Sequence, residues 1–279
     1  MAINSINTNA GAYVALQAFN STNTSLTMAQ NQISTGMRVA TATDNGAVWG
    51  VAQNMRGISN ALGVVQDSLN RGISVVNTAV AAGSTISDLL NQMKAKALSA
   101  TDPTSSSTDI TQYANDFKAM VAEIAKITST SNFNGINMIN TGGTTVQALA
   151  SYTGSVKITV AAANLTLGGA TLGATFTANL TFTTNTTASN VLTLVNTAIT
   201  NVNAAVGKLG TGVNALQTEL SFVQIQTNTL NTGVGNLVDA DVAAESAVLT
   251  SLQTKQQLGL QALTIANNNS SRLLSLFQG

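Results

Sequence analysis

The two ends of the chain are long, polar and almost uncharged, and this feature constrains the fold most. Residues 1–37 contain no charged side chain, and after Lys255 only Arg272 carries a charge. Both ends are rich in Asn, Gln, Ser and Thr, which hydrogen bonds can satisfy where a buried charge would be costly. This composition favours helices packed among many neighbours. A flexible polar tail is the alternative on composition alone.

Apolar side chains recur at helical spacing in the first of these ends. Residues 4–35 lack Pro and contain a single Gly. The larger apolar side chains of this end are Leu16, Phe19, Leu26 and Ile33. Intervals of three and seven residues fit one stripe of a long helix, so we predict a helix here.

The C-terminal end carries a more regular stripe, on one alternating series of three and four residues. Its apolar members are Val242, Leu249, Leu252, Leu263, Ala266, Leu273 and Phe277, and its polar or small members are Glu245, Gln256, Gly259 and Ser270. A helix over residues 240–276 would be about 55 Å long, capped by Asp239 and with Asp241 in its first turn. So narrow a stripe cannot stabilise an isolated helix, so we expect the terminal helices to pair.

The segment that follows the first end also predicts helix. Residues 44–99 have apolar positions at helical spacing, with Asp44 as a candidate N-cap. A Ser- and Thr-rich turn around Pro103 ends this helix and starts another over residues 109–129. Helical spacing returns over residues 188–230.

The middle of the chain changes character. Residues 141–187 are mostly Thr, Ala, Gly, Val and Leu, and the patterns over residues 156–160 and 175–182 predict short strands separated by turns. We also expect Gly233 and Gly235 to separate the last two helical segments. The chain therefore reads as helices, a small β-rich insert, and helices again.

The composition excludes several classes of function. The chain has no Cys and no His, which removes disulfides, Cys-ligated zinc, the commonest metal ligand and the usual general base. Its net charge is zero, so no basic excess exists for a nucleic acid or an anionic membrane. No apolar run approaches the ~20 residues that span a bilayer. We therefore predict no enzyme activity, cofactor or metal, no nucleic-acid partner and no membrane insertion.

The missing residue types also suggest how the chain reaches its destination. Pro occurs only at Pro103. A chain threaded unfolded through a channel would fold promptly afterwards, because it has no disulfide to form and few slow prolyl isomerisations. The start of the chain has no positively charged segment before an apolar run. We expect any export to leave the N-terminus uncut.

Several motifs, in order along the chain, resemble those of bacterial flagellins. Residues 33–39 (Ile-Ser-Thr-Gly-Met-Arg-Val), followed by residues 44–47, are similar to the N-terminal signature of that family. Residues 70–75 resemble its Asn-Asp-Gly-Ile-Ser segment, and residues 132–136 its Phe-Asn-Gly turn. Residues 245–277 are similar to its C-terminal helix.

The resemblance extends over most of the chain. It covers residues 1–140 and 190–279, and residues 252–259 look most like the short flagellins of alphaproteobacteria. The chain departs from the family pattern at Arg71, where Asp is common, and at residues 268–272, where many members carry Gln and Pro.

This resemblance implies a fold and an organisation. The fold would be mainly α: an elongated helical bundle with paired, coiled-coil terminal helices and a small β-rich insert. Residues 1–36 and 239–279 would form the inner tube of a filament, and residues 37–140 and 188–238 the outer tube. Residues 141–187 would be the variable surface insert. The two terminal stripes would then carry self-assembly.

The resemblance also implies a function and partners. The chain would be exported through a type III-type apparatus and would polymerise into the bacterial flagellar filament used for swimming. Its partners would be further copies or other flagellins, an export chaperone, and the cap and hook-junction proteins. A hook–filament junction protein shares the paired terminal helices and is the alternative within the same system. A secreted adhesin or surface-layer protein is a further alternative, and it predicts β-rich structure.

Two further sites follow from the resemblance. Similar flagellins often carry O-linked acidic sugars on the insert, where the candidates are Thr144, Thr145, Ser151, Thr153, Thr184 and Thr186. Many flagellins also share a helical patch read by the vertebrate innate receptor for flagellin, with Arg and Leu four residues apart. Those two positions become Gln92 and Lys96 in this chain. Because Gln lacks the Arg fork and Lys96 would bring an unpaired charge, we expect weak receptor activation.

Overall fold

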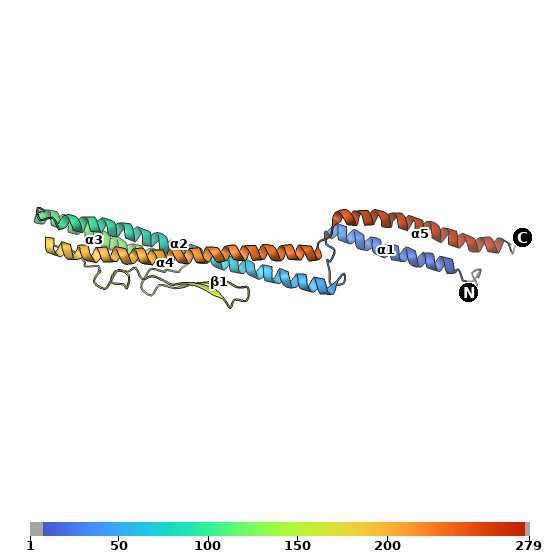
Figure 1. The fold of residues 1–279 in the computed structure, drawn as a ribbon, viewed down its shortest axis with the longest axis horizontal. Coiled ribbons are helices and arrows are strands. Elements are labelled where there is room, and N and C mark those ends of the chain that lie inside the picture. The colour runs from blue at the N-terminus through green and yellow to red at the C-terminus, as the bar shows by residue number, and fades with distance from the viewer. Residues whose placement is uncertain (1–7, 277–279) are drawn as a thin grey trace. The chain divides into compact units, whose positions relative to one another are not determined.

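A computed structural model describes residues 8–276 of the chain, with the side chains of its last helix described as far as residue 268. The described part contains five helices and one two-stranded sheet (Figure 1). In chain order the elements are α1 (Ala10–Thr35), α2 (Gly46–Ala100), α3 (Ser107–Thr130), β1 (Val146–Leu149), β2 (Lys157–Val160), α4 (Asn185–Val238) and α5 (Val242–Leu276). The predicted mainly α fold with a small β insert is confirmed.

The chain divides into two compact units, each built from segments far apart in the sequence. The terminal unit consists of residues Met1–Gly57 and Thr229–Gly279, and the central unit consists of residues Ile58–Asn228. Residues 141–187 belong to the central unit and do not form a third one. The assignment of the segments to inner and outer filament tubes stays a prediction.

The central unit has a dense apolar core. Its fully buried side chains come from all three of its helices and from the loops of the insert, and include Leu62, Leu69, Leu90, Phe117, Ile124, Phe176, Phe182 and Leu216. Polar side chains also join α2 to α4: Gln66 Nε2 donates to Thr227 Oγ1 at 3.1 Å, and Ser87 Oγ donates to Asn203 Oδ1 at 2.7 Å. By length and composition α2 also contains a stretch apolar enough to cross a membrane. The core helix of a bundle has the same composition.

The insert contains one of the two predicted strands. β1 and β2 pair antiparallel, with Val146 opposite Val160, which confirms the strand predicted over residues 156–160. The strand predicted over residues 175–182 is wrong, because that segment consists of turns. Its alternating aromatic residues are instead separate anchors in the core. The Phe182 ring packs edge-on against Phe117, with the ring centroids 5.4 Å apart.

The residues that cap two of the helices lie one or two positions beyond those predicted. Asp44 is not the cap of α2, because its Oδ2 accepts from the backbone N–H groups of Ala40 and Thr41 and closes the preceding turn. Asn45 caps α2 instead, since its Oδ1 accepts from the N–H of Val48 at 3.1 Å.

The same shift occurs at the start of α5. Asp241 is the cap, because its Oδ1 accepts from the N–H groups of Ala243 and Ala244 at 3.0 and 3.1 Å. Asp239, the predicted cap, lies before the helix and forms an antiparallel bridge with Met37. In both cases neighbouring polar residues compete for one cap position, and the position where the backbone turns decides between them.

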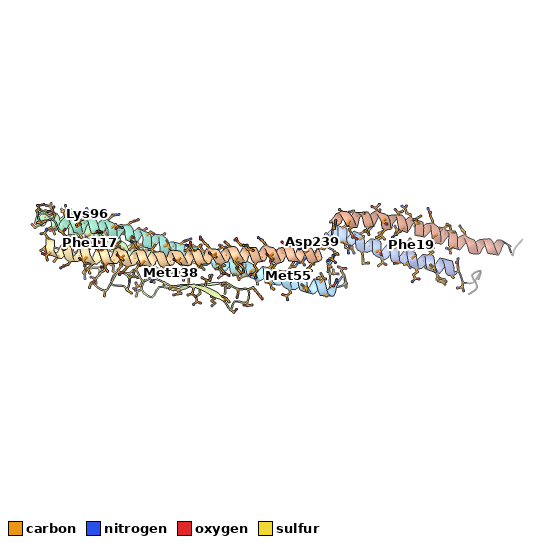
Figure 2. The ribbon with its side chains drawn as sticks, in the orientation of Figure 1. Phe19, Met55, Lys96, Phe117, Met138 and Asp239 are labelled. Atoms are coloured by element: carbon orange, nitrogen blue, oxygen red, sulfur yellow. The ribbon has the colours of Figure 1, made fainter. Side chains whose placement is uncertain are left out.

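The predicted break at Gly233 and Gly235 is also wrong, because α4 continues through both residues to Val238. A Cβ atom at Gly233 would lie 2.7 Å from the Cε atom of Met55, which Figure 2 labels on α2. Glycine therefore allows the close approach of α2 and α4 at this point. It does not end the helix.

Candidate self-assembly surface

The helices at the two ends of the chain lie side by side and run antiparallel (Figure 1). The prediction that the terminal helices pair is therefore confirmed. We call α1 and α5 together the terminal pair. α1 begins where the Asn9 side chain accepts from the Ala12 N–H at 3.0 Å. It ends at Gly36, whose φ of 67° is the left-handed conformation that glycine adopts without strain.

The seam between the two helices follows heptad spacing on α1. The less exposed apolar residues of this helix are Ala12, Ala15, Phe19, Leu26, Ala29 and Ile33. Three of the four predicted stripe residues lie on this face. Leu16 lies at the edge of this face: it is 44% exposed and lines a pocket with Ala12 and Leu263. The centre of the seam passes through Ala15.

On α5 the seam follows the predicted series closely. The half-buried residues of the described side chains are Glu245, Leu249, Leu252, Gln256, Gly259, Leu263 and Ala266. Val242 also falls on that series but is 45% exposed, because it lies at the very start of the helix. The side chain of Leu273, and all of Phe277, lie outside what the structure describes. The self-assembly role of the stripe residues stays a prediction.

Backbone hydrogen bonds fix the pair where the two helices meet the rest of the terminal unit. The N–H of Ala240 donates to the Gly36 carbonyl at 2.9 Å, and the N–H of Arg38 donates to the Val238 carbonyl at 2.7 Å. A small apolar cluster lies beside these bonds, built from Val39, Ala52, Val234 and Val238, with Trp49 packed against it.

Among the described side chains, Asn23, Gln256 and Asn9 form hydrogen bonds across the seam that sequence reasoning missed. Gln256 Nε2 donates to Asn23 Oδ1 at 2.7 Å. Asn9 Nδ2 donates to the Ala266 carbonyl at 2.8 Å, so this one side chain caps α1 and also contacts α5. The signal available was that Gln256 lies on the apolar series of α5.

The outward faces of the terminal pair expose large apolar side chains. Besides Leu16 and Val242, these are Tyr13, Val14 and Met28 on α1 and Val248, Leu258, Leu260 and Ile265 on α5. Val14 is 68% and Ile265 64% exposed. The sequence search also missed these residues, because it followed only one stripe per helix. Their signal was apolar side chains away from the stripe in a segment without charges.

The electrostatics of this surface are nearly neutral. The described side chains of the terminal pair carry charge only at Glu245 and Lys255, besides the capping Asp241. Apolar surface exposed in this way gains free energy when it is removed from water, by about 25 cal/mol per Å². Large exposed apolar patches mark contacts with other proteins. The arrangement is suited to association and offers no cluster of groups for acid–base or nucleophilic chemistry.

The fold and this surface define a class: a helical subunit whose terminal helices pair and leave large apolar side chains exposed. The comparisons with known proteins agree. Residues 6–144 match the family model of the bacterial flagellin N-terminal helical region, and residues 192–277 match that of the bacterial flagellin C-terminal helical region. The chain belongs to the bacterial flagellin family, and it is a structural subunit of the flagellar filament, an extracellular appendage.

Individual relatives support this conclusion over the full length. The chain is 46% identical to the flagellin FljM of Caulobacter vibrioides over 278 residues, which is 100% of both chains. It is 38% identical to a flagellin of Brucella melitensis, with 99% of each chain covered. Both relatives are flagellins, and nothing in them favours a hook–filament junction protein. The crystal structure of Bacillus cereus flagellin matches the fold with a TM-score of 0.50 and 24% identity, over 56% of this chain and 88% of that chain.

The candidate glycosylation residues differ in their surroundings. Thr144, Thr145 and Thr186 are exposed. Ser151 and Thr153 lie in the turn between β1 and β2, where their hydroxyls are 2.9 Å apart. The Thr184 hydroxyl accepts from the N–H of Thr187 at 3.2 Å and caps α4, so it is already engaged.

The two residues of the degenerate receptor patch lie on α2 in the central unit. Gln92 is exposed, whereas Lys96 is paired: its Nζ lies 2.8 Å from Asp116 Oδ2 and 5.9 Å from the centroid of the Tyr113 ring (Figure 2 labels Lys96). The expectation that Lys96 would present an unpaired charge is therefore corrected. Its ammonium is held by α3.

Proposed function

We propose that the chain polymerises through its terminal pair, which would form the inner tube of the filament. The observation that carries this proposal is the set of exposed apolar side chains on a nearly uncharged helix pair. In the filament, the outward faces of one terminal pair would contact those of neighbouring copies. Burying a large apolar side chain is worth about 1.5–3 kcal/mol, and each copy would repeat these contacts. Head-to-tail contacts that do not close extend into a filament.

The rest of the chain would face outwards. The central unit has its own core and would form the outer tube, with the insert of residues 141–187 on the filament surface. The subunit would be secreted unfolded through a type III-type apparatus, for which the absence of Cys is suited. It would meet an export chaperone, the cap and the hook-junction proteins on the way, and it would have no enzymatic activity.

A charge on the outward face tests this proposal. Leu258→Glu replaces a side chain that is 58% exposed, so the monomer should keep its helix content and its urea midpoint. Polymerisation should fall to background, because the filament would have to bury an unpaired carboxylate. Seeded assembly, followed by sedimentation and electron microscopy, measures this.

The matched control is Tyr152→Glu, which places the same charge on an exposed aromatic residue of the insert (49% exposed). This variant should polymerise like the unchanged chain. Normal filaments from Leu258→Glu, or equal loss in both variants, would show that the terminal pair is not the main assembly surface.

We also propose that the insert is glycosylated in the native filament, with Thr144, Thr145, Ser151, Thr153 and Thr186 as better acceptors than the capping Thr184. The exposure of four of these residues supports the proposal, and Ser151 is half-buried. Intact-mass spectrometry of native filaments should show added sugar masses. An unmodified mass of 28.4 kDa would remove the idea.

Finally, we propose that the chain activates the innate flagellin receptor weakly. Gln92 lacks the planar fork of Arg, and Lys96 would have to leave Asp116 to be buried in an interface. Losing two anchors of ~2 kcal/mol each would lower the affinity about a thousandfold. Reporter cells should therefore stay near background, and Gln92→Arg with Lys96→Leu should raise the response. Full potency of the unchanged protein would contradict this proposal.

A further inference from the structure

The seam of the terminal pair poses a problem of selectivity. Both helices carry heptad stripes of small and aliphatic side chains, so the apolar contacts alone would let α1 pair with α1, or α5 with α5, of another copy. A filament would bring many identical helices together. Specific contacts in the seam must therefore favour the pairing of α1 with α5.

The first selective feature is the hydrogen bond between Asn23 and Gln256. Both side chains are half-buried in the seam, and Gln256 Nε2 lies 2.7 Å from Asn23 Oδ1. A polar residue at a core position of a coiled coil fixes its partner at a cost in stability. Gln256 in an α5–α5 seam, or Asn23 in an α1–α1 seam, would face aliphatic side chains unless an equivalent amide stood opposite. Burying such a group without a partner is unfavourable.

The second selective feature is the contact between Phe19 and Gly259, one turn further along the seam (Figure 2 labels Phe19). A Cβ atom at Gly259 would lie 3.3 Å from Phe19 Cδ2 and 3.8 Å from Phe19 Cβ. The largest side chain of the α1 stripe thus meets the only seam position of α5, within the described side chains, that has no side chain. Every apolar position of the half-buried α1 stripe carries a side chain, so the stripe of a second α1 offers no such gap to Phe19.

We propose that the Asn23–Gln256 hydrogen bond and the Phe19–Gly259 contact select α5 as the partner of α1 and reject pairing of like helices. The selected register continues the one that the Ala240–Gly36 backbone bond begins. This inference rests on the proposed assembly through the terminal pair. It adds the residues that decide which helices of a crowded tube pair with each other.

Disulfide trapping tests the proposal, because the chain has no cysteine of its own. A Cβ atom at Gly11 would lie 4.0 Å from Ala266 Cβ, which fits the ~3.5–4.5 Å of a disulfide. The double variant Gly11→Cys, Ala266→Cys therefore reports the α1–α5 pair. Gly11→Cys alone reports α1–α1 contacts as dimers on a non-reducing gel, and Ala266→Cys alone reports α5–α5 contacts.

The disulfide yields of these cysteine variants are then compared in chains that carry one of two further pairs of substitutions (the two backgrounds). Asn23→Leu with Gln256→Leu removes the polar link, and Asn20→Leu with Gln253→Leu adds the same side chains at exposed positions as a control. Both the sedimented polymer and the supernatant are oxidised and scored. We expect the first background to raise the single-cysteine dimers about tenfold relative to the control, because one lost neutral hydrogen bond corresponds to roughly this ratio.

The outcomes separate the two proposals. If the double-cysteine variant forms no intrachain disulfide in filaments of the otherwise unchanged chain, assembly through the terminal pair is wrong, and this inference falls with it. If that disulfide forms but the two leucine backgrounds give the same dimers in both fractions, only the selectivity is overturned. Excess like-with-like dimers in the first background alone would support it.

Discussion

The central unit and the terminal pair are both helical, but they differ in how much of their apolar surface they bury within one chain. In the central unit, side chains such as Leu62, Phe117 and Leu216 are fully buried. In α1 only Ala29 is buried, and no residue of α5 is, as far as its side chains are described. Folding must offset about 1–2 kcal/mol of backbone entropy per residue. We expect the central unit to do this alone and the terminal pair to need the contacts of other copies.

The distribution of charge follows the same division. The central unit carries ion pairs on its surface, between Lys96 and Asp116 and between Lys126 and Glu123. The terminal pair has Asn, Gln and Thr in place of such charges. The Thr hydroxyls often donate to a carbonyl of their own helix, as Thr22 does to the Ala18 carbonyl. A surface that stays in water can carry charges. If other copies cover the terminal pair, as we propose, that surface is better without charges.

Removing half of the terminal pair should have the largest effect. A chain that lacks residues 240–279 should form no filaments, because α1 loses its partner. The central unit should still fold, since its core contains none of the deleted residues. Sedimentation and electron microscopy measure the first expectation, and a cooperative urea transition measures the second. Filaments from this variant would show that assembly does not need the terminal pair.

Hydrogen exchange of the monomer should show the same contrast residue by residue. Amides in the cores of α2, α3 and α4 should be protected at least about a thousandfold more than those of α1 and α5. A folded unit opens with a free energy of about 5 kcal/mol or more, whereas a sparsely packed helix pair opens easily. In filaments the terminal amides should gain protection. Equal protection of both units in the monomer would show that the terminal pair is stable alone.

Single truncations sharpen the contrast further. Phe117→Ala should lower the free energy of unfolding of the monomer by about 3–5 kcal/mol, because it leaves a cavity beside Phe182. Leu263→Ala should change it by less than about 1 kcal/mol. Urea unfolding of purified monomer measures both. Leu263→Asp should leave the monomer equally stable and yet abolish filaments, so normal filaments from that variant would count against the seam.

The helices and their pairing could be predicted from the sequence because both depend on periodic apolar residues. The series that contains Leu249, Leu252 and Leu263 identified the seam of α5, since heptad spacing places such residues on one face whatever they contact. The false break at Gly233 has the opposite cause. A glycine that ends a helix and one that admits a neighbouring side chain look alike until the neighbour, here Met55, is known.

Side-chain pairs between distant residues could not be predicted, because a local sequence pattern does not identify the partner. The Asn23–Gln256 bond joins residues 233 positions apart. The place of Gln256 on the apolar series of α5 indicates a seam position, but nothing in the sequence identifies Asn23 as its partner. The Lys96–Asp116 pair was missed for the same reason, as it joins two helices across a turn. The strand predicted over residues 175–182 was wrong, because alternating apolar and polar residues occur in irregular segments as well as in strands. Here Phe176 and Phe182 are two separate buried residues of the core.

The smallest expected effect concerns acid. Hydrogen bonds from Thr104 lower the pKa of Asp102, and those from Ser106 lower the pKa of Asp109, both from an ordinary value of 3.8. Donation from the Thr41 backbone N–H likewise lowers the pKa of Asp44 in the terminal unit. A carboxyl whose pKa is depressed by folding stabilises the protein above its unfolded pKa. This contribution is lost as the pH falls through the lower, folded pKa.

The monomer should therefore have a slightly lower urea midpoint at pH 3 than at pH 7. Part of that difference should disappear in Asp109→Asn, because Asn keeps an acceptor in the Ser106 capping box but does not titrate. Asp44→Asn should leave the difference unchanged, because the transition of the monomer reports the central unit and Asp44 lies outside it. Asp44→Asn could instead reduce the change in urea midpoint between pH 3 and pH 7 as much as Asp109→Asn does. The terminal unit would then unfold together with the central unit, and the two would form one cooperative structure in the monomer.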